Sequence, residues 1–161
     1  MAGGSSLRNF DWDSLRDKDV IAINNAALRL PFAQHAYFAD RDWFVRWENE
    51  LTLHLNVHQG VSDEHEWVDR PWVRRWEFAA HFTLAPRELI GGCSGNAAIN
   101  LAVQLGYTEL HLLGYDFDTS RNFHSDNLHD NHRPDIWRQR FDEMLPALKQ
   151  QQIQIKSGAP S

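Results

Sequence analysis

This sequence has little cysteine, no excess of basic residues and no long hydrophobic run. Its one cysteine, Cys93, excludes an internal disulfide framework and any zinc site built from several cysteines, and it fits the reducing cytosol, so we expect a cytoplasmic protein. Sixteen Lys and Arg against 22 Asp and Glu give a net charge of −6, which argues against duplex nucleic acid as a partner. No apolar run approaches the ~20 residues that span a bilayer, so we expect no membrane partner either.

What the chain does contain is a large aromatic and histidine content, with seven Trp, nine Phe and nine His. Hydrophobic residues make up 42% of its 161 residues, an ordinary value for a globular protein. Because domains commonly have ~100–200 residues, we expect a single domain spanning residues 1–161.

The N-terminal third shows short apolar runs separated by polar residues. A short helix is predicted near 11–16, buried strands at 19–25 and 35–40, and a helix with one aromatic face at 42–50. In 51–57 leucine or valine alternates with polar residues, which predicts another strand.

The segment 60–89 has the least regular pattern. It interleaves tryptophans with arginines, namely Trp67, Trp72 and Trp76 with Arg70, Arg74 and Arg75. Such residues would stack on nucleobases or sugars. The favoured interpretation is a surface helix whose tryptophans pack on the sheet while its arginines stay in water.

The C-terminal half predicts a crossover unit. A glycine-rich loop at 91–95 precedes a helix with apolar positions at 98, 101, 102 and 105, which Gly106 ends; a strand follows at 109–113. A helix opening at Pro134 and kinked or split at Pro146, then a short strand at 153–155, complete the chain. Together these elements predict an α/β fold with a mainly parallel sheet flanked by helices.

Polar residues at the predicted strand ends mark the place where chemistry is expected. They are Asn24, Asn25, Asp40, Asn56, His58, Asp116 and Asp118. Ligands of open α/β sheets bind beyond the carboxyl ends of the strands, although Asn and Asp are also common turn residues. The loop at 91–95 would hold an anion at the helix start, with Ser94 as a cap or a phosphate contact.

The segment 116–135 holds the densest cluster of titratable residues. Three of the nine histidines lie there, His124, His129 and His132, among five aspartates. Histidine titrates near pH ~6.5, which suits general acid–base chemistry. Metal binding and a merely solvated acidic loop are the alternatives.

The block 94–102, followed by 105–107 and 110–116, resembles the signature of the MptE-like (6-hydroxymethylpterin pyrophosphokinase-like) superfamily in its short phage-type members, and is similar to a stretch of bacterial lipooligosaccharide sialyltransferases. The resemblance implies a Rossmann-like domain that binds a nucleotide or nucleotide sugar. It places eight residues around that ligand: Gly3, Gly4, Ser5, Ser6, Asn24, Asp40, Ser94 and Gly95.

The same resemblance implies a transferase, of either the glycosyl or the diphosphate group. In the sialyltransferase-like members a histidine of the loop after the Gly-x-Asp strand is the base, which corresponds to His124, with His129 and His132 as alternates. In the pyrophosphokinases, Asp40 and Asp116 would hold Mg²⁺. The strand that precedes the family's glycine loop is not found here, so the alternative is a non-catalytic binding or assembly module, with a homo-oligomer as one form.

Overall fold

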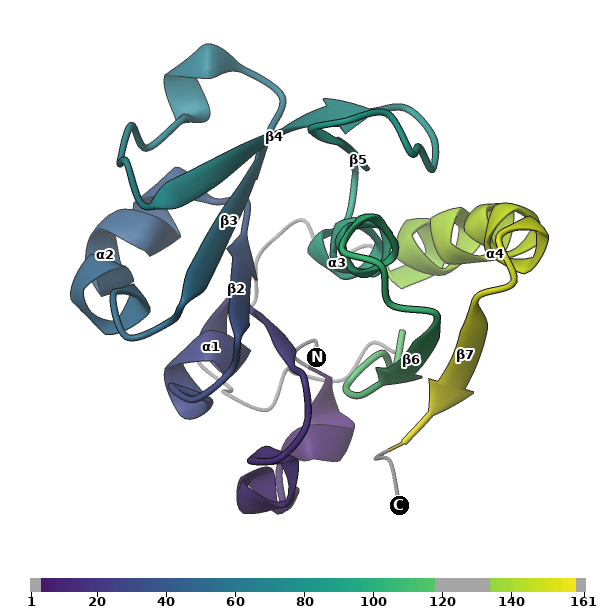
Figure 1. Ribbon diagram of the computed structural model, residues 1–161, viewed down its shortest axis with the longest axis horizontal. Helices are drawn as coiled ribbons and strands as arrows, with labels where there is room; N and C mark the ends of the chain where they lie inside the picture. Colours follow the sequence, from purple (N-terminus) through teal and green to yellow (C-terminus); the bar gives the residue numbers. More distant parts are fainter. Residues whose placement is uncertain (1–3, 118–133, 159–161) are drawn as a thin grey trace.

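The computed structural model describes residues 4–117 and 134–158, and it has a Rossmann-like α/β fold (Figure 1). Five parallel strands pair in chain order, and two further strands form a separate parallel pair. The five are β1 (Ile21–Ile23), β2 (His35–Phe38), β3 (Asn56–Val61), β4 (Val73–Ala79) and β5 (Glu88–Ile90); the pair is β6 (Glu109–Leu112) and β7 (Gln154–Ser157). The predicted parallel α/β class is confirmed.

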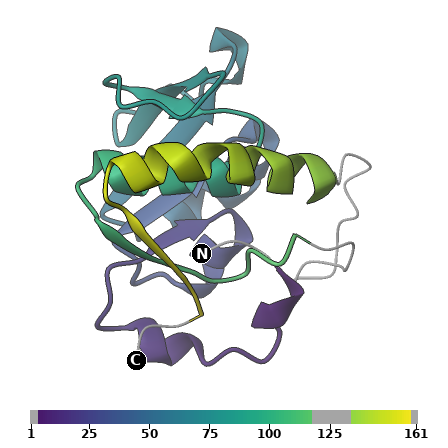
Figure 2. The same cartoon turned by 90° about the vertical axis from the view of Figure 1, so that its right-hand side faces the viewer.

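Helices cover both faces of the five-stranded sheet. They are α1 (Asn25–Arg29), α2 (Arg41–Leu51), α3 (Ser94–Gln104) and α4 (Pro134–Gln150), with 3-10 turns η1 (Ser5–Leu7), η2 (Trp12–Leu15) and η3 (Glu64–Glu66). α1 and α2 lie on one side and α3 on the other, and α4 packs outside α3 (Figures 1 and 2).

Alternation along each strand divides the core between these two faces. In β2, Ala36 and Phe38 pack with Phe44 of α2, whereas Tyr37 packs with Ala97 of α3. A third cluster joins α3 and α4 to β6 and β7. β1 and β2 are therefore buried on both faces, as their continuous apolar character predicts.

Most predicted elements are present, with boundaries moved by a few residues. The strands expected at 19–25, 35–40, 109–113 and 153–155 and the helix at 42–50 all occur. The residues expected in a helix near 11–16 form the 3-10 turn η2.

The predicted break at Pro146 is wrong. α4 runs from Pro134 to Gln150 as one helix that includes this proline. Its side chain lies on the exposed surface, away from the buried Met144 and Leu148 that pack α4 against its neighbours. Packing of the buried stripe therefore outweighs the loss of one backbone hydrogen bond.

The strand predicted at 51–57 is also wrong. Leu51 is the last residue of α2 and is fully buried. It lies with Phe44 on the buried side of that helix. Leu53 and Leu55 are 65% and 85% exposed, and β3 begins only at Asn56. The alternation was coincidental, since its leucines do not share a buried face.

The surface helix predicted within 60–89 does not form. β4 and β5 occupy this segment instead, and Trp76 lies within β4 with only 8% of its surface exposed. The expected burial of the tryptophans is nevertheless correct, since Trp67 and Trp72 pack against the first core cluster while Arg74 is exposed.

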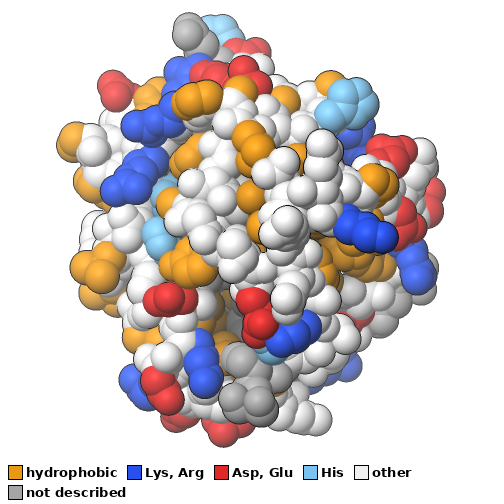
Figure 3. Space-filling model, turned by 45° about the vertical axis from the view of Figure 1, so that its right-hand side comes forward, with side chains coloured by type: hydrophobic (Ala, Val, Ile, Leu, Met, Phe, Trp, Pro, Cys, Tyr) orange, Lys and Arg blue, Asp and Glu red, His pale blue; other side chains and the backbone are white. Residues whose placement is uncertain are grey.

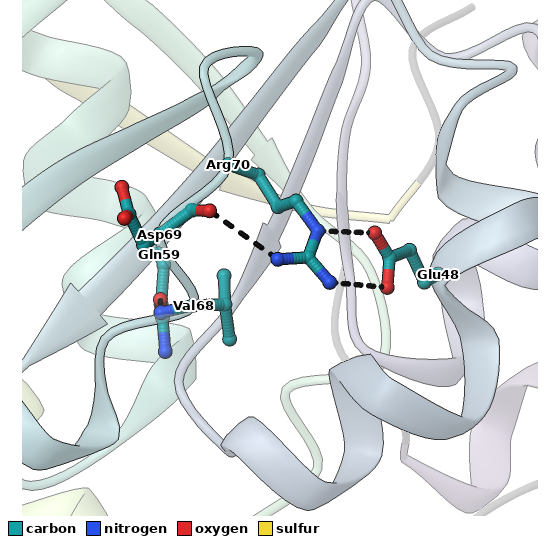
Figure 4. Close-up of polar contacts among 5 residues, drawn as sticks. All are labelled: Glu48, Gln59, Val68, Asp69 and Arg70. Atoms are coloured by element: carbon teal, nitrogen blue, oxygen red, sulfur yellow. Dashed lines mark hydrogen bonds and ion pairs between the residues drawn. The ribbon is translucent and has the colours of Figure 1, made fainter.

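The connection between β3 and β4 is fastened by polar contacts (Figure 4). The buried amide of Gln59 accepts from the Val68 N–H at 3.1 Å and donates to the Glu66 carbonyl at 2.7 Å. Arg70 donates through Nε and Nη2 to the two carboxylate oxygens of Glu48 in α2, at 2.5 and 3.1 Å. These bonds pair the polar groups of a long loop that has little regular secondary structure to pair them.

Charges of both signs are interspersed over the face drawn in Figure 3. Within residues 4–117 and 134–158, no helix combines the length and apolar character needed to cross a membrane.

Candidate functional site

The candidate site is the carboxyl edge of the sheet, where parallel strands place their last residues together. It comprises Gly4 to Ser6, Asn24, Asp40, residues 91–95, and Tyr115 with Asp116. The Gly91 N–H donates to the Ala79 carbonyl at 2.9 Å, and the Tyr115 hydroxyl donates to the Gly95 carbonyl at 2.9 Å. These bonds tie the ends of β4 and β6 to the start of α3.

Asp116 is held by the two serines that follow Gly4. The Ser6 N–H and hydroxyl donate to its two carboxylate oxygens at 2.7 Å each, and the Ser5 hydroxyl donates at 3.3 Å. The Gly4 N–H donates to the Gly114 carbonyl at 3.0 Å, and a Cβ on Gly4 would lie 2.4 Å from an Asp116 oxygen. The glycine is thus required by close approach, and the serine donors already serve a carboxylate.

Asn24 has an unusual backbone and an unsatisfied side chain. Its φ of 50° and ψ of −126° lie in a region that non-glycine residues rarely adopt. Its carbonyl accepts from the Ala27 N–H at 2.8 Å, but its side chain does not cap α1, and its Oδ1 atom is buried with no partner among the described residues. Strain and an unpaired polar atom at one residue are typical of a functional position.

Tyr37 contributes a second unpartnered atom on the α3 side of the sheet. Its ring is fully buried, and its hydroxyl has no partner in the described part of the chain. A Cβ on Gly60 of β3 would lie 2.2 Å from that hydroxyl, so only glycine fits beside it. Burial raises the pKa of Tyr37 above its ordinary value, with a smaller effect from Cys93, and the phenol therefore stays neutral.

The first turn of α3 supplies the third unpartnered polar atom, which belongs to Asn96. Asn96 is fully buried and donates through Nδ2 to the Trp137 carbonyl of α4 at 3.3 Å, while its Oδ1 finds no partner among the described residues. Burial raises the pKa of the neighbouring Cys93 thiol, and N–H bonds from Asn96 and Gly95 oppose that rise. A thiol whose pKa is raised is a poor nucleophile, which agrees with a structural role.

Arg140 of α4 lies over the glycine-rich loop, although its place there has no signal in the sequence. Gly92 has φ +88°, and a Cβ on it would lie 2.9 Å from Arg140 Nε. Only the packing of α4 on α3 brings residue 140 to residue 92, so no local pattern indicates it.

The other predicted residues have separate roles or fall outside the described ranges. Asp40 is exposed and accepts from the Trp43 N–H at 2.7 Å, which caps α2. Asn25 accepts from the Trp43 indole at 2.6 Å. Gly3, Asp118, His124, His129 and His132 lie outside the described residues.

Asp40 and Asp116, the residues predicted to hold Mg²⁺, both make contacts within the protein. Across residues 4–117 and 134–158, no three His, Cys, Asp or Glu side chains converge as metal ligands. Both oxygens of Asp116 accept from serines, and Asp40 caps a helix. Magnesium binding by Asp40 and Asp116 stays a prediction, and no reaction step is assigned to the ion.

One cavity of about 150 Å³ lies between β1 and β6, and on the β1 side it is lined by residues at the amino end of that strand. Its lining includes Val20, Ile21, Ile99, Ala102, Leu110 and Leu112. The cavity reaches Tyr115 but does not include Asn24, Tyr37 or Asn96. It is therefore a feature separate from the three unpartnered atoms.

Comparison of the chain with protein-family profiles, curated proteins and solved structures finds no match.

Proposed function

We propose that the carboxyl edge binds a nucleotide or nucleotide sugar. The observation that carries the proposal is a set of three buried polar atoms that have no partner within residues 4–117 and 134–158, namely the Oδ1 atoms of Asn24 and Asn96 and the hydroxyl of Tyr37. A buried acceptor without a donor costs about 1–3 kcal/mol, so such atoms indicate a bound donor. Ribose hydroxyls and the amino groups of nucleobases are donors of this kind.

The proposed activity is transfer of a glycosyl or diphosphate group from the nucleotide donor. His124 would take the proton of the acceptor hydroxyl, with His129 and His132 as alternates. The acceptor oxygen would then bond to the transferred group while the bond to the leaving phosphate breaks, and the leaving group would keep that electron pair. The motivation for His124 is the resemblance described above, together with the suitability of imidazole as a base at neutral pH.

The binding step is tested by a thermal-shift panel of nucleotides and nucleotide sugars, with and without Mg²⁺. Asn24→Gly removes the amide and suits the positive φ, so we expect a folded variant that loses the ligand-induced rise in melting temperature. Asn49→Ala, which removes an exposed amide from α2, is the matched control and should keep the rise. If no ligand raises the melting temperature of the wild type, the proposal fails.

The base is tested once the panel has identified a donor. We expect His124→Ala to lose turnover and keep donor binding, whereas the control His81→Ala, at an exposed position, should keep both. Full turnover by His124→Ala would refute its assignment, and single replacements of His129 and His132 would then examine the alternates.

The second candidate is a non-catalytic binding or assembly module, favoured by the cavity between β1 and β6. These strands belong to different sheets, and a cavity flanked by two strands suits an extended segment of a partner chain, including a second copy. Light scattering after size exclusion should then detect an oligomer that Leu112→Arg disrupts and Leu53→Arg, at an exposed position, does not. A monomer that binds nucleotide would argue against this role.

A further inference from the structure

Arg140 is a half-buried cation with no anionic partner in the described part of the chain. It lies on the side of α4 that faces α3, one turn after Trp137, whose carbonyl accepts from Asn96. Its guanidinium lies close to the backbone of Gly92, where a side chain would collide with it. A guanidinium that forms no ion pair within the described residues can donate its N–H groups to an external anion.

The acidic side chains of Glu143 and Asp116 are engaged in other contacts. Glu143, one turn along α4, accepts from Gln139 at 2.9 Å, and Asp116 accepts from Ser5 and Ser6. The first turn of α3 holds no acidic residue. Within residues 4–117 and 134–158, no acidic side chain forms an ion pair with Arg140, and the N-terminus of the 11-residue helix α3 adds partial positive charge beside it.

Two side chains in that first turn have a polar atom without a hydrogen bond to any described residue. The hydroxyl of half-buried Ser94 makes no hydrogen bond to any described residue, and the fully buried Asn96 directs its amide toward α4 with Oδ1 unpartnered. A phosphate at Arg140 would bring hydroxyl or ribose donors of the same ligand toward Asn96. The Arg140 guanidinium would thus bind the anionic part of such a ligand, and the Asn96 Oδ1 atom would accept a hydrogen bond from another part of it.

We infer that Arg140, together with the loop at residues 91–94 and the first turn of α3, binds a phosphate group of the nucleotide. The inference rests on the proposed nucleotide-binding function and names its phosphate contact. The planar guanidinium would donate two parallel hydrogen bonds to phosphate oxygens, and the Ser94 hydroxyl would donate a third. The exposed glycine at 92 leaves the approach open.

The test compares three kinds of probe by calorimetry: inorganic diphosphate, the common nucleoside diphosphates, and the matching nucleosides. We expect Arg140→Gln to weaken binding of diphosphate and of the preferred nucleoside diphosphate by about tenfold to a hundredfold, the loss typical of a hydrogen-bonded charge. Binding of the nucleoside should change less than about twofold, since it has no phosphate. Arg138→Gln, at an exposed position of the same helix, should change none of these affinities.

Arg140→Lys should recover part of the lost affinity, because it restores charge without the planar fork. Far-UV circular dichroism and thermal melts of each variant check that the fold is kept. Nucleoside diphosphate binding that is equal in wild type and Arg140→Gln would overturn the phosphate role and leave the proposed function intact. If the wild type binds none of the nucleotides, the proposed function itself fails, and the phosphate role with it.

Discussion

Acid should destabilise this protein through a buried histidine pair in the middle of the sheet. His58 of β3 is fully buried, with its Nδ1 3.1 Å from the Trp76 indole nitrogen and its Nε2 3.0 Å from Nδ1 of His35. Because an indole N–H only donates, Nδ1 of His58 must accept, and its proton is then on Nε2. Protonating either imidazole would set two N–H groups against each other.

Burial is the main reason that the pKa of His58 falls from 6.5 to about 3, and His35, Arg74 and Arg87 lower it further. The pKa of His35 is lowered as well, chiefly by burial. Between about pH 3 and 6.5 the unfolded chain binds a proton at His58 that the folded chain does not, so stability is complete above pH ~6.5 and falls with pH. From His58 alone the free energy of unfolding should decrease by about 2 kcal/mol at pH 5.

Urea denaturation at pH 7.5 and pH 5.0 measures this difference. His58→Gln keeps an acceptor for the indole but does not titrate, so we expect it to lower stability at pH 7.5 and to remove most of the dependence on pH. His81→Gln, at an exposed histidine, should leave that dependence unchanged. Equal stability of the wild type at the two pH values, or an unchanged pH dependence in His58→Gln, would refute the reasoning.

Three further predictions concern packing, each measured by the same denaturation. Leu51→Ala should cost about 2–5 kcal/mol and Leu55→Ala less than about 0.5 kcal/mol, because the first is fully buried and the second 85% exposed; similar losses would contradict the fold near α2. Gly60→Ala should cost about 1–3 kcal/mol, since its Cβ would lie 2.2 Å from the Tyr37 hydroxyl, and an unchanged variant would mean that this hydroxyl moves freely. Gln59→Leu should cost about 1–3 kcal/mol by leaving buried backbone groups unpaired, and neutral behaviour would show that water replaces them.

The α/β class and most elements could be predicted because each has its own local signal. The helical spacing of Ala98, Leu101, Ala102 and Leu105 and the stop at Gly106 describe α3 within a residue or two. The prediction of a strand at 51–57 was wrong because alternation in sequence indicates two different faces but does not show that either face is buried. Burial of a face depends on the neighbouring strands. Leu53 and Leu55 have no neighbour to cover them.

The prediction of a surface helix in the segment that forms β4 and β5 was wrong for a related reason. β4 pairs with β3 along five residues, so its tryptophan and arginines are placed by the register of that pairing. Trp76 is buried by packing in the second core cluster, and its indole donates to His58 of the neighbouring strand. Local composition could indicate that the tryptophans are buried, but not the element that buries them.

In the candidate site too, some features could be predicted from local sequence, and others depend on contacts between distant residues. Asn24 was predicted because it follows a strand, and the rule for open sheets needs only that local fact. Its strained backbone and unpaired Oδ1 arise from packing and could not be predicted. The pairing of Asp116 with Ser5 and Ser6 joins residues 110 or more positions apart, so neither end indicates the other.

The serine–aspartate contact and the position of Arg140 together define which half of the edge is open to an anion. Ser5 and Ser6 donate to a carboxylate of the protein itself, and a phosphate there would have to displace Asp116 and face its charge. At the other end, next to Gly92, a guanidinium stands without a counter-charge among the described residues. We therefore expect the phosphate of a bound nucleotide to lie beside α3 and α4, with the serine loop supporting Asp116.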